Sequence, residues 1–217
     1  TRRNFDIGNC DGYIITGLRE KDVEWIQALK KPVVVFGENR YGFDYVDTNN
    51  KLGTYQIANL ALEKGYEHLI YFGMDSTESF EQSREAGYLK QIQESKLIPK
   101  MYRFKNHSHL TEEFIEAHWT EFERNSVFIC STDRLAIGVE RGIAKCGGNI
   151  PHDYGVTGFD GVFLNQVASP KITTVKQSII EMGNACGESV LDKIANRGNT
   201  GSLIFEPKIE MGGTLRL

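Results

Sequence analysis

Residues 65–95 have the sequence GYEHLIYFGMDSTESFEQSREAGYLKQIQES. The glycine at position 65 is predicted to end a preceding helix, because glycine adopts the left-handed conformation at a helix C-terminus without strain. The apolar run at 68–72 predicts a buried strand, and the longer segment 79–95 predicts a helix. The stretch is therefore a strand, a loop and a helix in succession.

The same alternation extends to both sides of this stretch. Strands are predicted at 11–16, 33–36, 101–104, 127–130, 154–158, 203–205 and 208–211, and helices at 20–30, 48–64, 111–124, 133–146 and 177–196. Strand–helix alternation at this spacing predicts an α/β fold with parallel sheets built from right-handed βαβ units. Only two strands, 11–16 and 33–36, precede the helix at 48–64, and two strands are too few for a stable sheet.

The apolar residues of the predicted helix at 48–64 indicate which of its faces is buried. Leu52, Tyr55, Ala58 and Leu62 recur at helical spacing and are expected to face the core. The first predicted strand, 11–16, is expected to be buried.

The composition of the 217-residue chain is that of an ordinary globular protein, with 25% charged residues and a net charge of −4. A chain that binds DNA by itself is expected to carry a basic face, so this balance argues against nucleic-acid binding by this chain. No apolar run is long enough to cross a bilayer, and no signal peptide is visible. The four cysteines are scattered, and Cys10 and Cys130 lie in apolar runs, which predicts buried free thiols in a reducing cytoplasm.

The sequence motifs of common enzyme classes are absent. No GxGxxG follows a strand, and no P-loop, GxSxG elbow or HExxH pair occurs. No Cys/His cluster has the spacing of a zinc site. We therefore expect no enzymatic activity, no cofactor and no metal.

Eight short segments follow one another along the chain: DGYII (11–15), PVVVF (32–36), VDTN (46–49), GYEHLIYFG (65–73), SREAGY (83–88), STDRLAIG (131–138), IPHD with VTGFD (150–160) and SPKITTVKQ (169–177). In this order they resemble the LacI/GalR family of bacterial transcription regulators. Each segment alone is a weak signal, but eight in the right order are a strong one.

The resemblance implies two Rossmann-like lobes of the periplasmic-binding-protein-like type I, with the first lobe incomplete. Residues 1–48 and 178–206 would form the first lobe, and 49–177 and 207–217 the second. It also implies a helix-turn-helix headpiece, a hinge helix and the start of the first lobe ahead of Thr1. The expected function is the ligand-sensing core of a cytoplasmic, homodimeric regulator that touches operator DNA only through that headpiece. The alternative is a solute-binding protein for uptake.

Ligands of such sheets bind beyond the carboxyl ends of the strands, which directs attention to the residues that follow them. Arg84 lies just inside a predicted helix, where its guanidinium can donate to hydroxyls, a carboxylate or a phosphate. The alternative is a surface ion pair with Glu81 or Glu85, which contributes little stability. Because Arg84 matches the arginine of the family segment, ligand binding is favoured.

Asp133 and Asp160 also follow predicted strands. A carboxylate accepts from neighbouring sugar hydroxyls, and Thr132 can share that role. The alternative for Asp133 is a helix N-cap, and for Asp160 a local contact that stabilises its turn. The resemblance places both aspartates at the ligand cleft.

Gln177 and two phenylalanines complete the candidate ligand-binding residues. Gln177, at the crossover back to the first lobe, either reaches the cleft or supports the hinge. Phe36 and Phe159 can stack on a sugar or a base, or belong to the core. Some sugar-binding members of the family have an aspartate where Gly37 stands, so a plain sugar is less favoured than in those members.

Overall fold

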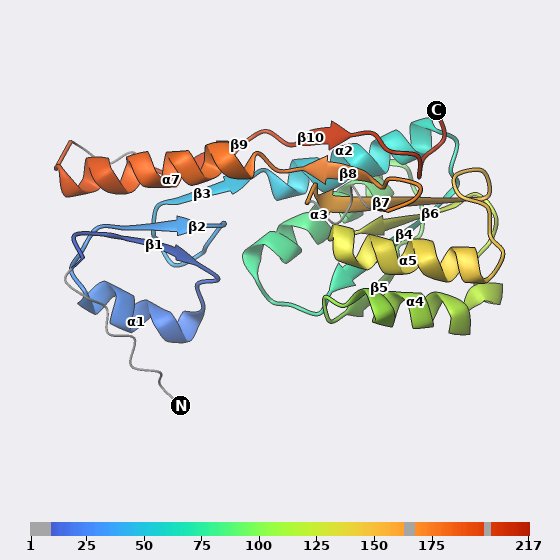
Figure 1. Cartoon of the computed structure of the whole chain (residues 1–217), viewed down its shortest axis with the longest axis horizontal. Helices are drawn as coiled ribbons and strands as arrows, with labels where there is room; N and C mark the ends of the chain where they lie inside the picture. Colours follow the sequence, from blue (N-terminus) through green and yellow to red (C-terminus); the bar gives the residue numbers. More distant parts are fainter. Residues whose placement is uncertain (1–9, 163–167, 198–200) are drawn as a thin grey trace. The chain divides into compact units, whose positions relative to one another are not determined.

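The computed structural model describes residues 10–162, 168–197 and 201–217, and the chain divides into two compact units (Figure 1). Unit 1 comprises Thr1–Thr48 and Ser178–Phe205, and unit 2 comprises Asn49–Gln177 and Glu206–Leu217. The chain therefore passes between the units three times. In the part that the structure describes, no helix is both long and apolar enough to cross a membrane.

Unit 1 is a parallel sheet with a helix on each face (Figure 1). Its strands, in spatial order, are β1 (Tyr13–Thr16), β2 (Val33–Phe36), β3 (Tyr45–Thr48) and β9 (Leu203–Phe205), and its helices are α1 (Glu20–Ala28) and α7 (Ile179–Ile194). Successive side chains of a strand point to opposite faces of the sheet. Val33 and Val35 accordingly pack in the cluster that holds Ile26 of α1, while Val34 packs with Met182 of α7.

Three predictions for unit 1 are wrong. The sheet has four strands, because β3 forms where no strand was predicted, and β9, which was predicted at 203–205, pairs with it. Strand β1 is not buried: Ile14 is 49% exposed, because β1 lies at the edge of the sheet. Cys10 is exposed instead of buried, whereas Cys130 is buried as expected.

Unit 2 is a six-stranded sheet covered by helices on both faces. Its strands, in spatial order, are β10 (Lys208–Glu210), β8 (Thr173–Lys176), β7 (Tyr154–Asp160), β6 (Ser126–Cys130), β4 (His68–Met74) and β5 (Lys100–Phe104). Every pair is parallel except β10 with β8. The helices are α2 (Asn50–Glu63), α3 (Ser79–Glu94), α4 (Ser108–Ala117), η1 (Trp119–Glu121) and α5 (Asp133–Lys145). The predicted α/β class with parallel sheets is confirmed.

The two faces of this sheet carry separate cores. Ile70 and Phe72 pack in a cluster with residues of α4 and α5, and Leu69 and Tyr71 pack in one with residues of α2 and α3. This alternation along β4 places α2 and α3 on one face and α4 and α5 on the other (Figure 1). Gly65 has a φ of +81°, as its predicted role at the end of α2 requires.

The buried face of α2 differs from the prediction. Ala58 is buried as expected, but Leu52, Tyr55 and Leu62 are only half-buried. The buried face includes Gly53, where a Cβ atom would lie 2.9 Å from the side chain of Val175. Because only glycine allows this close approach, Gly53 sets which side of α2 meets the sheet.

Candidate functional site

A buried arginine lies at the carboxyl edge of the sheet of unit 2. Arg84, in the second turn of α3, is only 4% exposed. Its Nε donates to Asn50 Oδ1 (2.9 Å), its Nη1 donates to the backbone oxygen of Ser131 (2.6 Å), and its Nη2 lies 3.1 Å from Asp160 Oδ1. The guanidinium therefore joins α2, the end of β6 and the end of β7.

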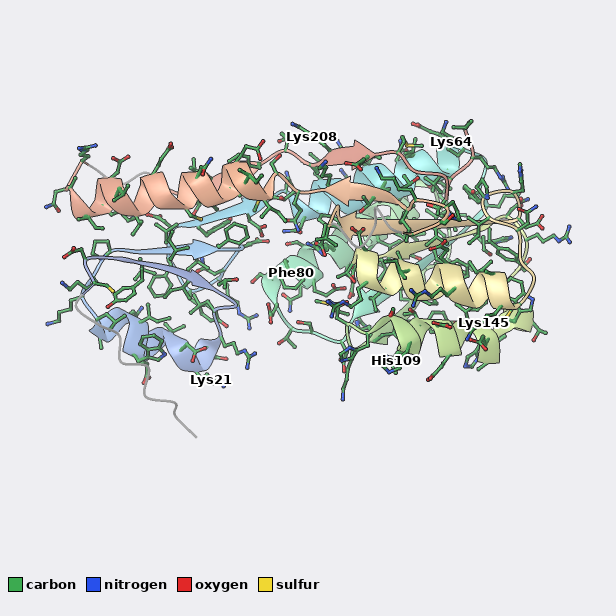
Figure 2. All side chains as sticks on the ribbon, in the orientation of Figure 1. Lys21, Lys64, Phe80, His109, Lys145 and Lys208 are labelled. Carbon is green, nitrogen blue, oxygen red and sulfur yellow. The ribbon has the colours of Figure 1, made fainter. Side chains whose placement is uncertain are left out.

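Two aromatic rings flank this guanidinium. The Cζ of Arg84 is 3.7 Å from the ring centroid of Phe159, which is buried, and 5.0 Å from that of Phe80. Phe80 lies at the start of α3 (Figure 2). Both distances suit cation–π attraction, which is strengthened where water is excluded. The ring of Phe159 thus supports Arg84.

The two alternative partners of Arg84 are engaged elsewhere. Glu85 pairs with Arg103 at 2.5 Å, and the buried Glu81 accepts a hydrogen bond from the Tyr71 hydroxyl (2.8 Å). The alternative of a surface ion pair between Arg84 and either glutamate is therefore wrong.

Asp160 ends β7 with an unusual backbone conformation. Its φ is +112°, a region that side-chain-bearing residues rarely occupy and that is often found at functional sites. The side chain is 25% exposed, and its Oδ1 accepts from Gln177 Nε2 (2.8 Å) as well as facing Arg84. Burial raises the pKa of Asp160, and the charge of Arg84 offsets part of that rise.

Thr132 begins α5 as its N-cap. Its hydroxyl oxygen accepts from the backbone nitrogen of Leu135 (3.2 Å), and its hydroxyl donates to Asn106 Oδ1 (2.9 Å). The alternative of Asp133 as the N-cap is therefore wrong, because Thr132 occupies that position.

Asp133 is fully buried beside Thr132. Its Oδ1 accepts from the hydroxyl of Thr174 (2.5 Å), and its Oδ2 accepts from the backbone nitrogen of Val162 (3.0 Å). A Cβ atom on Gly158 would lie 2.2 Å from Asp133 Oδ1. Asp133 thus holds together β7, β8 and the turn after Asp160.

The burial of Asp133 predicts a pH-dependent stability. Burial raises the pKa of Asp133 from 3.8 to about 7, so the folded chain binds this proton more tightly than the unfolded chain does. Its contribution to stability is full below pH 4 and is lost as pH rises to 7. Relative to Asp133→Asn, the free energy of unfolding of the wild type should fall by roughly 1 kcal/mol per pH unit between pH 5 and 7. Urea unfolding of both proteins at several pH values measures this difference. If the free energies of unfolding of the wild type and of Asp133→Asn change with pH in the same way, the prediction is contradicted.

The structure brings four of the seven predicted ligand-binding residues into one contact network. Arg84, Phe159, Asp160 and Gln177 are joined by the contacts above. Thr132 and Asp133 follow Ser131, whose backbone oxygen Arg84 contacts, at the same edge of the sheet. Phe36 ends β2 in unit 1, where it packs on the cluster containing Val34.

Asn50 and Ser131 were not predicted from the sequence as partners of Arg84. Asn50 is 34 positions away from Arg84, and Ser131 contributes a backbone oxygen, so neither has a local signal. The signal for Ser131 in the sequence is its position directly after a predicted strand.

The network leaves hydrogen-bonding capacity for a ligand. Within the described residues, Arg84 uses three of its five N–H donors, and Asp160 Oδ2 accepts no hydrogen bond. A quarter of the Asp160 side chain is open to solvent. The site can therefore both donate to and accept from a hydroxyl-rich molecule.

Comparison with known proteins decides the family. Residues 58–214 match the periplasmic binding protein-like domain family. The chain is 41% identical over 211 residues to the uncharacterized HTH-type transcriptional regulator YvdE of Bacillus subtilis, covering 96% of this chain and 67% of that protein. The chain belongs to the LacI/GalR family. The resemblance in the eight sequence segments is thereby confirmed.

More distant LacI/GalR proteins align over most of this chain. The ribose operon repressor of Haemophilus influenzae is 25% identical, covering 87% of this chain but only 58% of the repressor. The solved structure of a LacI family transcriptional regulator from Enterococcus faecium with bound ribose has a TM-score of 0.83 and 20% identity, covering 94% of this chain and 79% of that one. The LacI/GalR chain thus spans about half to two thirds of the length of the curated relatives it matches.

Proposed function

We propose that this chain is the ligand-sensing and dimerising core of a transcription regulator. Its ligand is a small polar effector, such as a sugar or a sugar phosphate, and its readout of operator DNA lies in a headpiece outside these 217 residues. The observation that carries the proposal is the Arg84–Asp160 pair, in which a buried guanidinium holds a partly exposed carboxylate at the carboxyl edge of a parallel sheet.

The chemistry of the pair favours a polyol. Asp160 Oδ2 can accept from a hydroxyl, and the N–H donors of Arg84 that its protein partners leave unused can donate to a second hydroxyl or to a phosphate oxygen. Gln177, already bonded to Asp160, orients the carboxylate for this contact. Binding through a preorganised carboxylate costs less conformational entropy than binding through a free one.

A solute-binding protein for uptake is the alternative with the same site. The names of the relatives favour the regulator, since YvdE and the Haemophilus protein are described as a transcriptional regulator and an operon repressor. The ribose held by the Enterococcus regulator supports a sugar as the class of ligand. As expected of such a regulator, we propose that this chain is a homodimer, that it lies in the cytoplasm and that it has no enzymatic activity.

A thermal-shift panel of pentoses, hexoses, their phosphates and nucleobases tests the proposal. A ligand present at 100 times its Kd should stabilise the folded chain by about 2.7 kcal/mol. We expect at least one sugar or sugar phosphate to raise the melting temperature of the wild type, and to do so less with Asp160→Asn. Arg103→Ala, which breaks an exposed ion pair, is the control and should keep the full shift. A panel without any stabilising sugar, or an equal shift in Asp160→Asn, would count against the proposal.

A further inference from the structure

Two of the three points where the chain passes between its units lie next to the Arg84–Asp160 pair in the hydrogen-bond network. The first passage falls between Thr48 and Asn49, and the second between Gln177 and Ser178. Asn50, two residues after Thr48, accepts from Arg84, and Gln177, the last residue before the second passage, donates to Asp160. One continuous chain of contacts, Asn50–Arg84–Asp160–Gln177, therefore connects the two passages within unit 2.

Hydrogen bonds that fix the local backbone lie beside each end of this chain of contacts. At the first passage, Asn49 accepts from the backbone nitrogens of Leu52 (through Oδ1, 3.1 Å) and Gly53 (through its carbonyl, 2.9 Å), and these bonds start α2. At the second, the backbone nitrogen of Gln177 donates to the carbonyl of Asp160 (3.2 Å), whose φ is +112°. A change at the pair therefore reaches the first turn of α2 and the segment that leads into α7.

Burial makes these bonds sensitive to the loss of a partner. Asn50 and Arg84 are both almost inaccessible to solvent, so water cannot replace either partner without a rearrangement. In a buried network of this kind, breaking one bond weakens its neighbours, and the effect of one change depends on whether the other has been made.

We propose that Asn50 and Gln177 are positioning residues that couple the two passages to each other through Arg84 and Asp160. A ligand that engages the pair changes the geometry at both passages at once, and this last step rests on the proposed function. The coupling itself is a property of the ligand-free chain. It gives Asn50 a role in transmission, whereas the sequence pointed only to Gln177 as a residue that supports the hinge.

Amide hydrogen exchange followed by NMR tests the coupling without any ligand. In Gln177→Ala, the amides of Leu52 and Gly53 should exchange about tenfold faster, although they lie at the other passage. In Asn50→Ala, the amide of residue 177 should exchange faster by a similar factor, because coupling between two sites is reciprocal. Gln93→Ala, a change of the same kind at an exposed position of α3, is the control and should leave all these rates unchanged.

The readouts separate coupling from a general loss of structure. The amide of His118, which donates to the carbonyl of Phe114 at the end of α4, should keep its rate in both variants. The proposal is overturned if the exchange rates of all these amides rise together, that of His118 included. It is also overturned if only the amides at the mutated passage exchange faster. Asn50→Asp, which keeps the acceptor for Arg84, should behave as the wild type. If Asn50→Ala does not fold, Asn50→Ser, which also removes the amide acceptor, takes its place. A chain that binds no sugar but shows this cross-effect would refute the proposed function and support the coupling. A chain that binds a sugar but shows no cross-effect would support the proposed function and refute the coupling.

Discussion

Replacement of Arg84 by methionine is expected to lower the free energy of unfolding of unit 2 by about 3 kcal/mol. Methionine fills much of the same volume but makes none of the three hydrogen-bonding contacts to Asn50, Ser131 and Asp160. It also leaves Asp160 as a largely buried carboxylate without its cation. Truncating one member of a buried charged pair costs far more than the pair itself contributes, because the remaining group stays desolvated.

Urea unfolding measures this loss, with the fluorescence of Trp119 as the reporter for unit 2. A Trp25→Phe background removes the only other tryptophan, which lies in unit 1. Arg103→Met is the matched control, because Arg103 and Glu85 form an exposed pair. That change should cost less than about 1 kcal/mol. Equal losses in the two variants would mean that the contacts of Arg84 are no stronger than a surface ion pair.

Replacement of Gly138 by alanine is expected to cost about 3 kcal/mol through overpacking between α4 and α5. A Cβ atom there would lie 1.9 Å from the backbone oxygen of Ser108 and 2.1 Å from the hydroxyl of Thr111. The Thr111 hydroxyl is 2.9 Å from the carbonyl oxygen of Leu135, so it cannot move away without losing a contact between the helices. Lys145, near the far end of α5, adds ion pairs to Glu112 and Glu116 of α4 that hold the two helices together (Figure 2).

The same fluorescence assay measures the loss for Gly138→Ala. Gly183→Ala on α7 is the control, because a Cβ atom there would meet nothing within 4 Å. In a helix interior that change should stabilise unit 1 by about 0.5–1 kcal/mol, reported by Trp25 in a Trp119→Phe background. A Gly138→Ala variant as stable as the wild type would show that α4 and α5 can separate at little cost.

The parts of the fold with strong periodicity were predictable from sequence. The strand predicted at 68–72 is β4 (His68–Met74), and the helix predicted at 79–95 is α3 (Ser79–Glu94). Each has a pattern long enough to distinguish a strand from a helix. Because α3 begins where it was expected, Arg84 was also placed correctly at the carboxyl edge of the sheet.

Two short strands, β3 and β8, were not predictable in the same way. Strand β3 contains the buried Asp47, and β8 contains the buried Thr173 and Thr174, so neither is an apolar run. Their burial depends on tertiary hydrogen bonds, such as the one from the Thr173 backbone nitrogen to the hydroxyl of Thr214 (2.9 Å). A pattern within four residues carries no information about partners more than forty positions away.

The partners within the site were unpredictable for a related reason. The sequence indicated Arg84 and Asp160 as separate ligand contacts, and the structure pairs them at 3.1 Å. It indicated Phe159 as a residue that stacks on a ligand or belongs to the core, and its ring is buried under the guanidinium. Family segments identify which positions matter, whereas the distances between them follow from the packing of α2, α3 and the strand ends.

Isothermal titration calorimetry of the stabilising sugar or sugar phosphate is the most direct test of binding at the Arg84–Asp160 pair. We predict that Asp160→Asn and Arg84→Lys each weaken the affinity at least about tenfold, equivalent to about 1.4 kcal/mol, while Arg103→Ala binds as the wild type does. Circular dichroism at the titration temperature establishes that each variant is folded. Folded Asp160→Asn and Arg84→Lys proteins that bind the ligand with the Kd of the wild type would contradict the account.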